Sequence, residues 1–212
     1  MDILQFKKVP FLGIMRGVQE SQLESLVEAS IAGGLKALEI TMNTSEAASL
    51  IRSAAAITKG RLVIGAGTVC DVESLRQALD VGATFIVSPV LVEEVVSHCR
   101  KQSIPVFPGA LTPQEIYRAW DAGATMVKVF PAKFFGPAYF KEIKGPFHDI
   151  KLLACGGVTP ENKNEFFSNG ADAVAFGESV FRKEWISGKE YHRITDRIKN
   201  YINNTAFDIR DF

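Results

Sequence analysis

The chain has 212 residues and equal numbers of basic and acidic side chains, 24 of each. This balance argues against nucleic acid as the main partner, because the protein has no excess positive charge to displace the counterions of a phosphate backbone. No apolar run approaches membrane-spanning length and the first residues lack the order of a signal peptide, so we expect a cytoplasmic protein with no membrane partner. Three cysteines and three histidines are scattered without metal-ligand spacing, so we expect no metal and no cofactor.

Eight apolar, β-prone runs alternate with helical patterns along the chain. In chain order, the predicted strands are residues 9–15, 37–41, 61–66, 85–89, 105–108, 126–130, 151–155 and 173–176. From the second run onward, the starts lie 20 to 25 residues apart. That spacing is the length of one strand, one helix and two short loops, which is the βα unit of a parallel sheet.

Turn and cap residues fall between these runs. Gly82, Gly123 and Gly170 each end a helical pattern and precede a strand, where glycine fits the left-handed residue that closes a helix. Asp71 and Thr112 are typical residues for the start of a helix. These signals agree with the spacing of the apolar runs.

The eight βα units show no linker or composition break, which predicts one domain over residues 1–212, an α/β fold closed as a (β/α)8 TIM barrel. The alternative is an open doubly wound sheet, but its glycine-rich G-x-G-x-x-G turn is absent after the first strand. We expect a short N-terminal capping helix around Phe6 to cover the barrel bottom. Residues 191–203 should form the last helix, and residues 205–212 should fray or pack at a subunit contact.

Lys128 lies in the middle of the apolar run 126–130, which Pro131 ends. A lysine is rarely buried unless it is paired or functional, and an all-apolar strand is normally covered on both faces. Removal from water favours the neutral amine, which is the nucleophile of Schiff-base chemistry. Phe130 and Pro89 would form the apolar wall that excludes water. The alternative is a structural lysine that snorkels from an edge strand.

Glu39 is the carboxylate that this lysine could work with. Function in a barrel lies at the C-terminal ends of the strands, and side chains alternate between the two faces of each strand. Glu39 falls on the second predicted strand and Lys128 on the sixth, which are opposite each other in an eight-stranded barrel. We therefore predict that they form a catalytic pair across the lumen. The alternative is a buried structural ion pair, which the cost of desolvation disfavours.

Two glycine-containing loops follow the last two predicted strands. Gly156 and Gly157 follow the seventh strand, and Gly177, Glu178 and Ser179 follow the eighth. Main-chain N–H groups at a helix start bind phosphate, and barrels often place a phosphate after strands seven and eight. We predict a phosphate site there, although the glycines could merely turn the chain. Glu178 would repel a phosphate unless its side chain points away.

Seven motifs in order carry a specific resemblance to a known family. They are Gly13-Ile14-Met15-Arg16, Leu38-Glu39-Ile40-Thr41, Gly65-Ala66-Gly67-Thr68-Val69, Phe85-Ile86-Val87-Ser88-Pro89, Pro108-Gly109-Ala110-Leu111-Thr112-Pro113, Val127-Lys128-Val129-Phe130-Pro131-Ala132 and Gly156-Gly157-Val158-Thr159-Pro160. From about Pro10 to Phe181 the chain resembles the bacterial 2-keto-3-deoxy-6-phosphogluconate (KDPG) and 4-hydroxy-2-oxoglutarate (KHG) aldolases, class I enzymes on a (β/α)8 barrel. The resemblance implies a homotrimer that needs no metal.

The resemblance also implies a reaction and roles for its residues. Lys128 would form the Schiff base, Glu39 would transfer protons, and Arg16 and Thr68 would bind the carboxylate region of the pyruvate moiety. The expected reaction cleaves 2-dehydro-3-deoxy-6-phosphogluconate to pyruvate and glyceraldehyde 3-phosphate. Cleavage of 4-hydroxy-2-oxoglutarate to pyruvate and glyoxylate is a further expectation. The glycine loops would hold the distal phosphate.

Three departures from the best-known gluconate-type pattern fall on substrate-binding positions. Asn43 replaces an arginine and resembles the galactonate-type relatives, Cys155 replaces a threonine, and Glu178 replaces the second glycine of a Gly-Gly-Ser loop. They leave open the cleavage of 2-dehydro-3-deoxy-6-phosphogalactonate. A Schiff-base dehydratase or decarboxylase of a 2-keto acid, a phosphate-binding barrel isomerase, and a non-catalytic barrel that binds a sugar phosphate are the rival functions.

Overall fold

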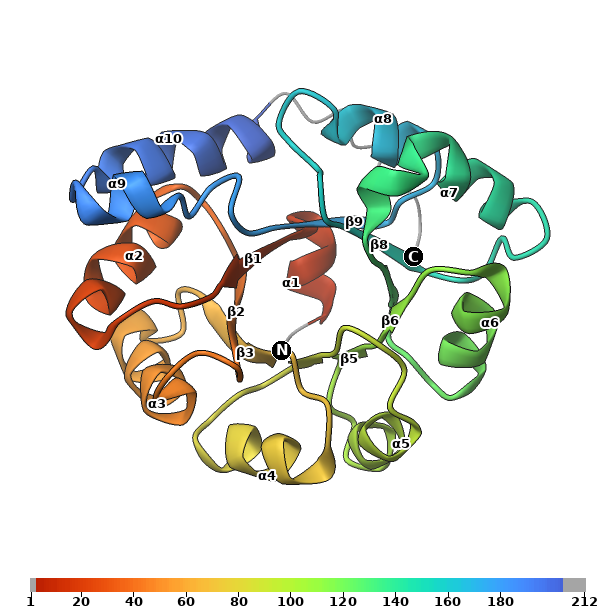
Figure 1. The fold of residues 1–212 in the computed structure, drawn as a ribbon, viewed down its shortest axis with the longest axis horizontal. Helices are drawn as coiled ribbons and strands as arrows, with labels where there is room; N and C mark the ends of the chain where they lie inside the picture. Colours follow the sequence, from red (N-terminus) through yellow and green to blue (C-terminus); the bar gives the residue numbers. More distant parts are fainter. Residues whose placement is uncertain (1–2, 204–212) are drawn as a thin grey trace.

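Parallel strands form a barrel at the centre of the molecule in the computed structural model, which describes residues 3–203 (Figure 1). The strands are β1 (Phe11–Met15), β2 (Ala37–Thr41), β3 (Val63–Gly67), β4 (Ile86–Val87), β5 (Val106–Phe107), β6 (Gly109–Ala110), β7 (Val127–Val129), β8 (Leu152–Cys155) and β9 (Ala173–Phe176). Their order in the sheet is β5-β4-β3-β2-β1-β9-β8-β7-β6. The expected eight runs are all present as strands.

The ninth strand arises from the predicted run 105–108. In the structure this barrel strand extends to Ala110 and is interrupted, so that it counts as two strands, β5 and β6. Pro108 separates β5 from β6, since proline has no N–H for the ladder. The Phe107 carbonyl accepts from Ser88 N at 3.2 Å on one side, and the Pro108 carbonyl accepts from Lys128 N at 2.9 Å on the other. These bonds link β4 to β7 through one segment and close the barrel, as predicted.

Helices surround the barrel as an outer ring, except the first helix, which lies within the ring of strands in this view (Figure 1). They are α1 (Ile3–Lys8), α2 (Glu20–Ala32), α3 (Ala47–Thr58), α4 (Val72–Asp80), α5 (Glu93–Lys101), α6 (Pro113–Asp121), α7 (Gly136–Lys144), α8 (Lys163–Ser168), α9 (Lys183–Ser187) and α10 (Tyr191–Ile202), with a 3-10 turn, η1, at Ala132–Phe134. Asp71 accepts from Ser74 N at 2.7 Å, and Thr112 and Glu115 form a capping box. The predicted helix starts at Asp71 and Thr112 are therefore confirmed.

The barrel interior is a packed apolar core rather than a pore, as is usual for this fold. Side chains from every part of the barrel fill it, namely Leu12, Ala37, Phe85, Val87, Phe107, Met126, Leu153, Cys155, Ala173 and Ala175. Phe6 of α1 belongs to the same cluster, and its ring centre lies 6.0 Å from that of Phe107. Figure 1 shows α1 across the ring of strands, so the predicted capping helix is confirmed.

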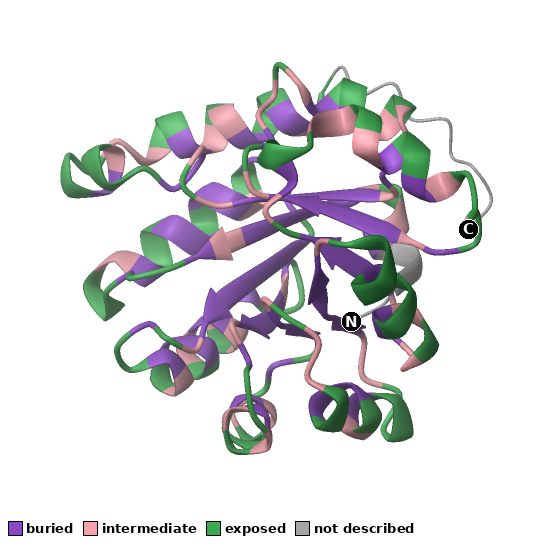
Figure 2. Cartoon of the chain, turned by 45° about the vertical axis from the view of Figure 1, so that its right-hand side comes forward, coloured by how far each residue is buried: buried purple, intermediate pink, exposed green. Residues whose placement is uncertain are grey.

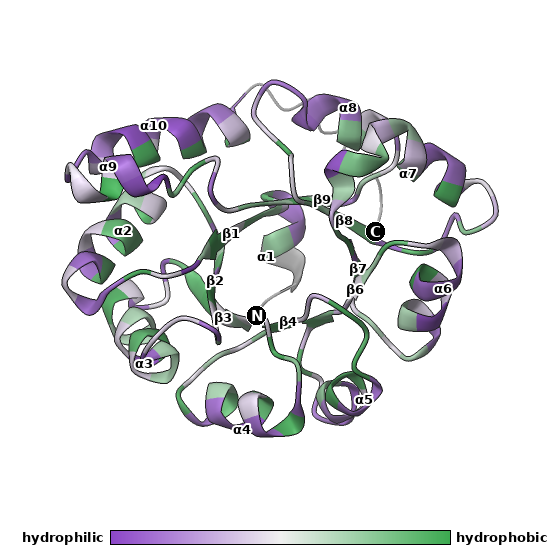
Figure 3. Cartoon of the chain, viewed as in Figure 1, coloured by the Kyte–Doolittle hydropathy of each residue, from purple (hydrophilic) through white to green (hydrophobic). Residues whose placement is uncertain are grey.

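A second apolar core lies between the strands and the outer helices. Almost every strand residue is buried, whereas the helices alternate buried and exposed residues (Figure 2). Hydrophilic residues accordingly gather on the solvent side of the helices (Figure 3). No helix within residues 3–203 is long and apolar enough to cross a membrane. The expectation for residues 205–212 lies outside the described residues.

Candidate active site

Lys128 and Glu39 face each other across the upper part of the barrel lumen. Lys128 lies on β7 and Glu39 on β2, and four steps separate these strands in either direction when β5 and β6 count as one strand. Lys128 is 6% exposed and Glu39 is 1% exposed. The ion pairs of the described residues do not include one between Lys128 and Glu39. The buried structural ion pair considered as an alternative is therefore absent.

The Glu39 carboxylate occupies space that a glycine leaves open. A Cβ atom at Gly67, at the end of β3, would overlap the Glu39 carboxylate, with Oε1 as the nearest atom. Two residues earlier on the same strand, a Cβ at Gly65 would overlap the Phe85 ring. Because β3 has no side chain at Gly65 and Gly67, the Glu39 carboxylate and the Phe85 ring have room to lie inside the narrow barrel.

Burial gives the Glu39 carboxyl group unusual acid–base properties. Loss of hydration raises the pKa of Glu39, while the positive charges of Lys128 and Arg16 act in the opposite direction. Oε2 of Glu39 is buried without a hydrogen-bond partner in the described part of the chain. A buried carboxyl with a raised pKa and an unused oxygen is suited to accept and return a proton near neutral pH.

Phe130 and Cys155 are the neighbours of the lysine. The Nζ atom of Lys128 lies 5.2 Å from the centre of the Phe130 ring, so the ring face covers the amine. Cys155 ends β8 inside the lumen and is 3% exposed. Burial raises the pKa of the Cys155 thiol, and the nearby Lys128 charge opposes that shift. Cys155 is therefore a neutral thiol within reach of the substrate-binding space.

Arg16 and Thr68 meet at the mouth of the barrel. Arg16 follows β1, and its guanidinium Nη2 lies 3.5 Å from Thr68 Oγ1. Thr68 follows β3 with φ 56°, a left-handed conformation that is strained for a β-branched residue. Arg16 is exposed, yet its charge opposes the larger effect of burial, which raises the pKa of Glu39. The pair thus presents a cation and a hydroxyl next to the lumen.

Asn43 lies in the exposed turn that follows β2. The next residue, Thr44, is buried and fixes this turn, because its hydroxyl lies 3.0 Å from Thr41 Oγ1 and accepts from Gly17 N at 3.1 Å. The loops after β1 and β2 are therefore joined, and Asn43 is held at the mouth. No signal in the sequence distinguishes Thr44 from an ordinary helix-start residue.

Gly156 and Gly157 both adopt left-handed conformations, with φ of 90° and 88°. A Cβ on Gly157 would overlap the Cβ of Lys133, and the Gly156 carbonyl accepts from Lys133 N at 2.9 Å. Asn162 Nδ2 donates to the Gly157 carbonyl at 3.1 Å. Both glycines are required by backbone conformation, and the turn they make is tied down on two sides.

The second loop forms a tight turn after β9. Gly177 O accepts from the N–H groups of Val180 and Phe181, both at 2.9 Å, and Glu178 is exposed. Four main-chain N–H groups of the two loops donate no hydrogen bond within residues 3–203; they belong to Gly157, Val158, Glu178 and Ser179. Such N–H groups form an anion-binding concavity.

Tyr201 of α10 connects the two glycine loops, a role that sequence reasoning misses. Its hydroxyl donates to Val158 O at 2.7 Å and lies 2.9 Å from Ser179 Oγ. In the sequence, Tyr201 follows Ile194 and Ile198 at helical spacing, which predicts an ordinary core position. Only the fold brings its hydroxyl to the loops.

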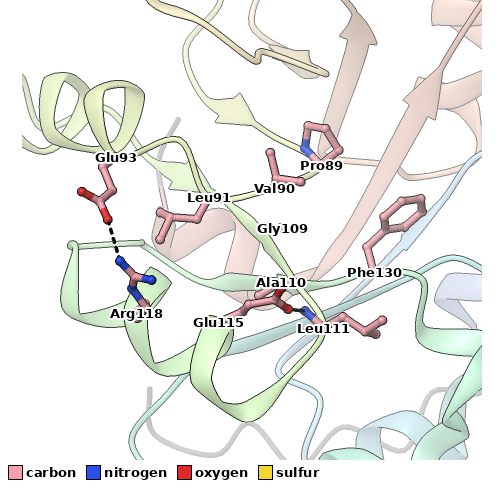
Figure 4. Close-up of a pocket in the computed structure, with 10 residues that line it drawn as sticks. All are labelled: Pro89, Val90, Leu91, Glu93, Gly109, Ala110, Leu111, Glu115, Arg118 and Phe130. Carbon is pink, nitrogen blue, oxygen red and sulfur yellow. Dashed lines mark hydrogen bonds and ion pairs between the residues drawn. The ribbon is translucent and has the colours of Figure 1, made fainter.

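Pro89 and Phe130 also line an open pocket of about 490 Å³ beside the barrel mouth (Figure 4). The loop after β4, strand β6 and helices α5 and α6 supply most of its lining, and Glu93 and Arg118 form an exposed ion pair at its outer side. This pocket extends the site away from Lys128. In the described part of the chain, no group of three or more His, Cys, Asp or Glu residues could hold a metal ion.

Comparison with known proteins decides the family. The family model described as KDPG and KHG aldolase matches residues 3–197. The chain belongs to the KDPG and KHG aldolase family. It is 33% identical over 176 residues to the 2-dehydro-3-deoxy-6-phosphogalactonate aldolase of Escherichia coli, covering 82% of this chain and 86% of that protein.

Further members of the KDPG and KHG aldolase family show the same likeness. The 2-dehydro-3-deoxy-phosphogluconate aldolase of Pseudoalteromonas atlantica is 32% identical over 182 residues, covering 85% of this chain and 84% of that protein. The crystal structure of KDPG aldolase from Legionella pneumophila, with pyruvate captured as a covalent carbinolamine intermediate, superimposes with a TM-score of 0.84 at 26% identity, covering 91% and 94% of the two chains. The protein is thus a class I aldolase, a carbon–carbon lyase on a TIM-like barrel.

Proposed function

We propose that this aldolase cleaves 2-dehydro-3-deoxy-6-phosphogluconate to pyruvate and glyceraldehyde 3-phosphate, with Lys128 as the covalent residue. The observation that carries the proposal is the buried placement of Lys128 and Glu39 on opposite strands of one lumen, with no ion pair between the two side chains. A buried charge pair without a direct bond has a poor structural rationale, whereas separated groups leave room for a substrate between them. Cleavage of 4-hydroxy-2-oxoglutarate to pyruvate and glyoxylate fits the same groups.

Lys128 is the nucleophile that starts the reaction. Its Nζ attacks the C2 ketone, and loss of water gives an iminium ion. When the C3–C4 bond breaks, its electron pair flows into the iminium and leaves an enamine, so the lysine supplies the electron sink. The enamine is then protonated at C3, and water hydrolyses the resulting iminium to release pyruvate and the free amine. The Phe130 ring over Nζ helps to exclude bulk water during these steps.

Glu39 moves the protons. It takes the C4 hydroxyl proton as the C3–C4 bond breaks, which releases the aldehyde, and a proton then returns to C3 of the enamine. The raised pKa of the buried carboxyl matches this double role, because the group must be unprotonated for the first step and protonated for the second. The unused Oε2 atom is the oxygen that faces the substrate hydroxyl.

Arg16 and Thr68 hold the carboxylate of the substrate. The guanidinium presents planar donors that suit a carboxylate, and the Thr68 hydroxyl adds a further donor. The strained backbone of Thr68 supports this role, because strain of this kind persists where a side chain must be aimed. Binding at this end orients C2 toward Lys128.

The glycine loops hold the distal phosphate. The N–H groups of Gly157, Val158, Glu178 and Ser179 donate no hydrogen bond within the described residues, and Tyr201 joins the two loops that carry them, which suits a phosphate oxygen cluster. Glu178 is exposed, so its carboxylate can point into solvent while its N–H binds. A phosphate so far from the reacting bond supplies binding energy for orientation.

The galactonate isomer is a second candidate substrate. Asn43, held at the mouth by Thr44, and the neutral Cys155 thiol beside Lys128 are the residues that depart from the gluconate-type pattern. A 2-dehydro-3-deoxy-6-phosphogalactonate aldolase is among the relatives of this chain, at 33% identity.

A pyruvate-release assay tests the proposed function. The purified protein is given the gluconate and galactonate phosphosugars, their unphosphorylated forms and 4-hydroxy-2-oxoglutarate. We expect a kcat/KM for 2-dehydro-3-deoxy-6-phosphogluconate above that of every other compound. The highest value for the galactonate isomer would replace the proposed substrate by the second candidate. Pyruvate release from none of them would contradict the aldol cleavage.

We further propose that the protein works as a homotrimer. Phe134, Phe135 and Val90 are large apolar side chains that are more than half exposed at the rim of the barrel mouth. Exposed apolar groups of this size on one rim favour contact with another subunit. Light scattering coupled to size-exclusion chromatography should give three times the 23.2 kDa chain mass, and a monomer mass would contradict the proposal.

A further inference from the structure

The hydroxyl of Tyr201 lies between the two loops that carry the free N–H groups. It donates to Val158 O at 2.7 Å and lies 2.9 Å from Ser179 Oγ. These two partners follow different strands, β8 and β9, and are 21 residues apart in the sequence. One hydroxyl therefore fixes the distance between the two halves of the anion site.

The direction of the two hydrogen bonds follows from counting hydrogens. A tyrosine hydroxyl has one hydrogen, and a carbonyl oxygen can only accept, so that hydrogen is used by Val158 O. The bond between Ser179 and Tyr201 must then run from the serine O–H to the tyrosine oxygen. With its hydrogen used in this way, the Ser179 hydroxyl has only lone pairs left, and lone pairs repel a phosphate.

We propose that Tyr201 is a positioning residue of the anion site, and that main-chain N–H groups rather than the Ser179 hydroxyl hold the anion. The inference rests on the proposed function, because it concerns the seat of the substrate phosphate. Ser179 acts through its bond to Tyr201, while the N–H groups of Gly157, Val158, Glu178 and Ser179 point to the anion.

Tyr201 is itself held firmly. Its side chain is fully buried, its ring stacks on Phe176 with centres 4.4 Å apart, and it meets Phe11 edge-on. Burial raises the pKa of Tyr201 to about 12, so the hydroxyl keeps its hydrogen at neutral pH. The Tyr201 hydroxyl must be rigid and protonated to donate to Val158 O while it accepts from Ser179.

Lys163 of α8 fixes the end of α10 next to Tyr201. Its buried ammonium donates to Asn200 O at 2.7 Å, to Asn203 O at 2.8 Å and to Tyr201 O. Asn200 and Tyr201 lie in the last turn of α10 and Asn203 directly follows the helix, so these carbonyls have no partner inside the helix. The helix end is thereby tied to α8, which begins soon after the first glycine loop (Figure 1).

A double-mutant cycle on Tyr201 and Ser179 tests the inference. Loss of one hydrogen bond corresponds to about a 2- to 13-fold effect, so Tyr201→Phe and Ser179→Ala should each raise KM for the phosphorylated sugar acid by about that factor. Inhibition by inorganic phosphate should weaken to the same extent, while kcat stays within about twofold. The double variant Tyr201→Phe/Ser179→Ala should have the same KM as Tyr201→Phe, because both substitutions break the same hydrogen-bonded chain from Ser179 through Tyr201 to Val158.

Different results from the cycle would overturn the inference. If the Ser179 hydroxyl binds the phosphate directly, Ser179→Ala will raise KM more than Tyr201→Phe does. The KM increase of the double variant will then be the product of the two single increases. Thr195→Val is the matched control, because it removes another α10 hydrogen bond, to Ala29 O at 3.0 Å, away from the loops. It should lower Tm without changing KM, and a KM increase equal to that of Tyr201→Phe would reduce Tyr201 to a structural role.

The cycle also separates this inference from the proposed function. A wild-type protein that cleaves no phosphorylated sugar acid would overturn both. A wild-type protein that cleaves one, with a KM that neither Tyr201→Phe nor Ser179→Ala changes, would overturn the positioning role alone.

Discussion

Glu39 shows at the scale of one residue how the site trades stability for chemistry. Its carboxyl is 1% exposed, and β3 has glycine where a side chain would collide with it. Burial raises the pKa of Glu39 against the opposing charges of Lys128 and Arg16. A neutral isostere at this position would avoid the cost of desolvating a carboxylate.

Glu39→Gln should therefore raise stability and abolish most activity. Because the folded pKa is raised, the folded chain binds more protons than the unfolded chain between the two pKa values, so native stability falls as pH rises through that interval. Above the folded pKa, the full cost of burying the Glu39 carboxylate is present. We expect a Tm gain of about 2–4 °C per kcal/mol relieved at pH 7, which disappears below about pH 4. Turnover should fall by about 100-fold or more.

Thermal unfolding of both proteins from pH 4 to pH 8 checks the stability difference, and pyruvate release checks turnover. A Tm difference that does not grow with pH would show that the Glu39 carboxylate carries no burial cost. Near-normal turnover of the variant would remove Glu39 from the proton-transfer role.

Sequence reasoning worked best for residues whose chemistry conflicts with their surroundings. Lys128 and Glu39 could be singled out because charges in apolar strands are costly, and alternation placed them opposite each other. Tyr201 could not be found in this way, because a tyrosine on the apolar face of a helix predicts only core packing. The role of its hydroxyl depends on which loops lie near the end of α10.

The glycine pair on β3 shows at the scale of one element how backbone shape makes room for the site. Gly67 lies beside the Glu39 carboxylate, and Gly65 lies beside the Phe85 ring. Either could be mistaken for an ordinary weak point in a strand. Strand boundaries were less predictable, since Pro108 divides one barrel strand into two short ladders.

Gly67→Ala and Gly65→Ala form a matched pair that tests the role of these glycines. Both should destabilise the protein by about 1–3 kcal/mol through overpacking. Gly67→Ala should also displace the Glu39 carboxylate and reduce kcat by at least about tenfold, whereas Gly65→Ala should leave kcat within about threefold. Denaturant unfolding measures the first effect and steady-state kinetics the second. Equal kcat values for the two variants would contradict the role given to Gly67.

α1 acts as the plug of the barrel bottom through Phe6, which is 2% exposed and packs against Phe107. Phe6→Ala should cost about 3–5 kcal/mol because it leaves a cavity under the lumen. The site lies at the other end of the barrel, so kcat should stay close to that of the wild type at a temperature where the variant is folded. A large loss of kcat together with unchanged stability would contradict the plug.

At the scale of the whole molecule, the fold separates stability from function along the barrel axis. Apolar residues and α1 fill the lower lumen, while Glu39 and Lys128 lie within β2 and β7, and Arg16 and Thr68 directly follow β1 and β3. The regular spacing of strands was enough to predict this architecture. The identity of the sugar was not predictable, because it depends on a few side chains at the mouth rather than on the fold.

Chelation should leave the whole enzyme active, since the iminium on Lys128 supplies the electron sink that a metal would otherwise provide. Dialysis against EDTA should change pyruvate release by less than the error of the assay. An activity that EDTA abolishes and a divalent cation restores would contradict the Schiff-base mechanism.

Covalent trapping of pyruvate is the measurement that tests the role of Lys128 most directly. Borohydride added with pyruvate should reduce the iminium and leave one adduct per chain, which peptide mass spectrometry should place on Lys128. Lys163 is the internal control, because it is a similarly buried lysine whose ammonium is bonded to three carbonyls. An adduct on Lys128 with Lys163 unlabelled is the predicted result, and an unmodified Lys128 would contradict the Schiff-base mechanism.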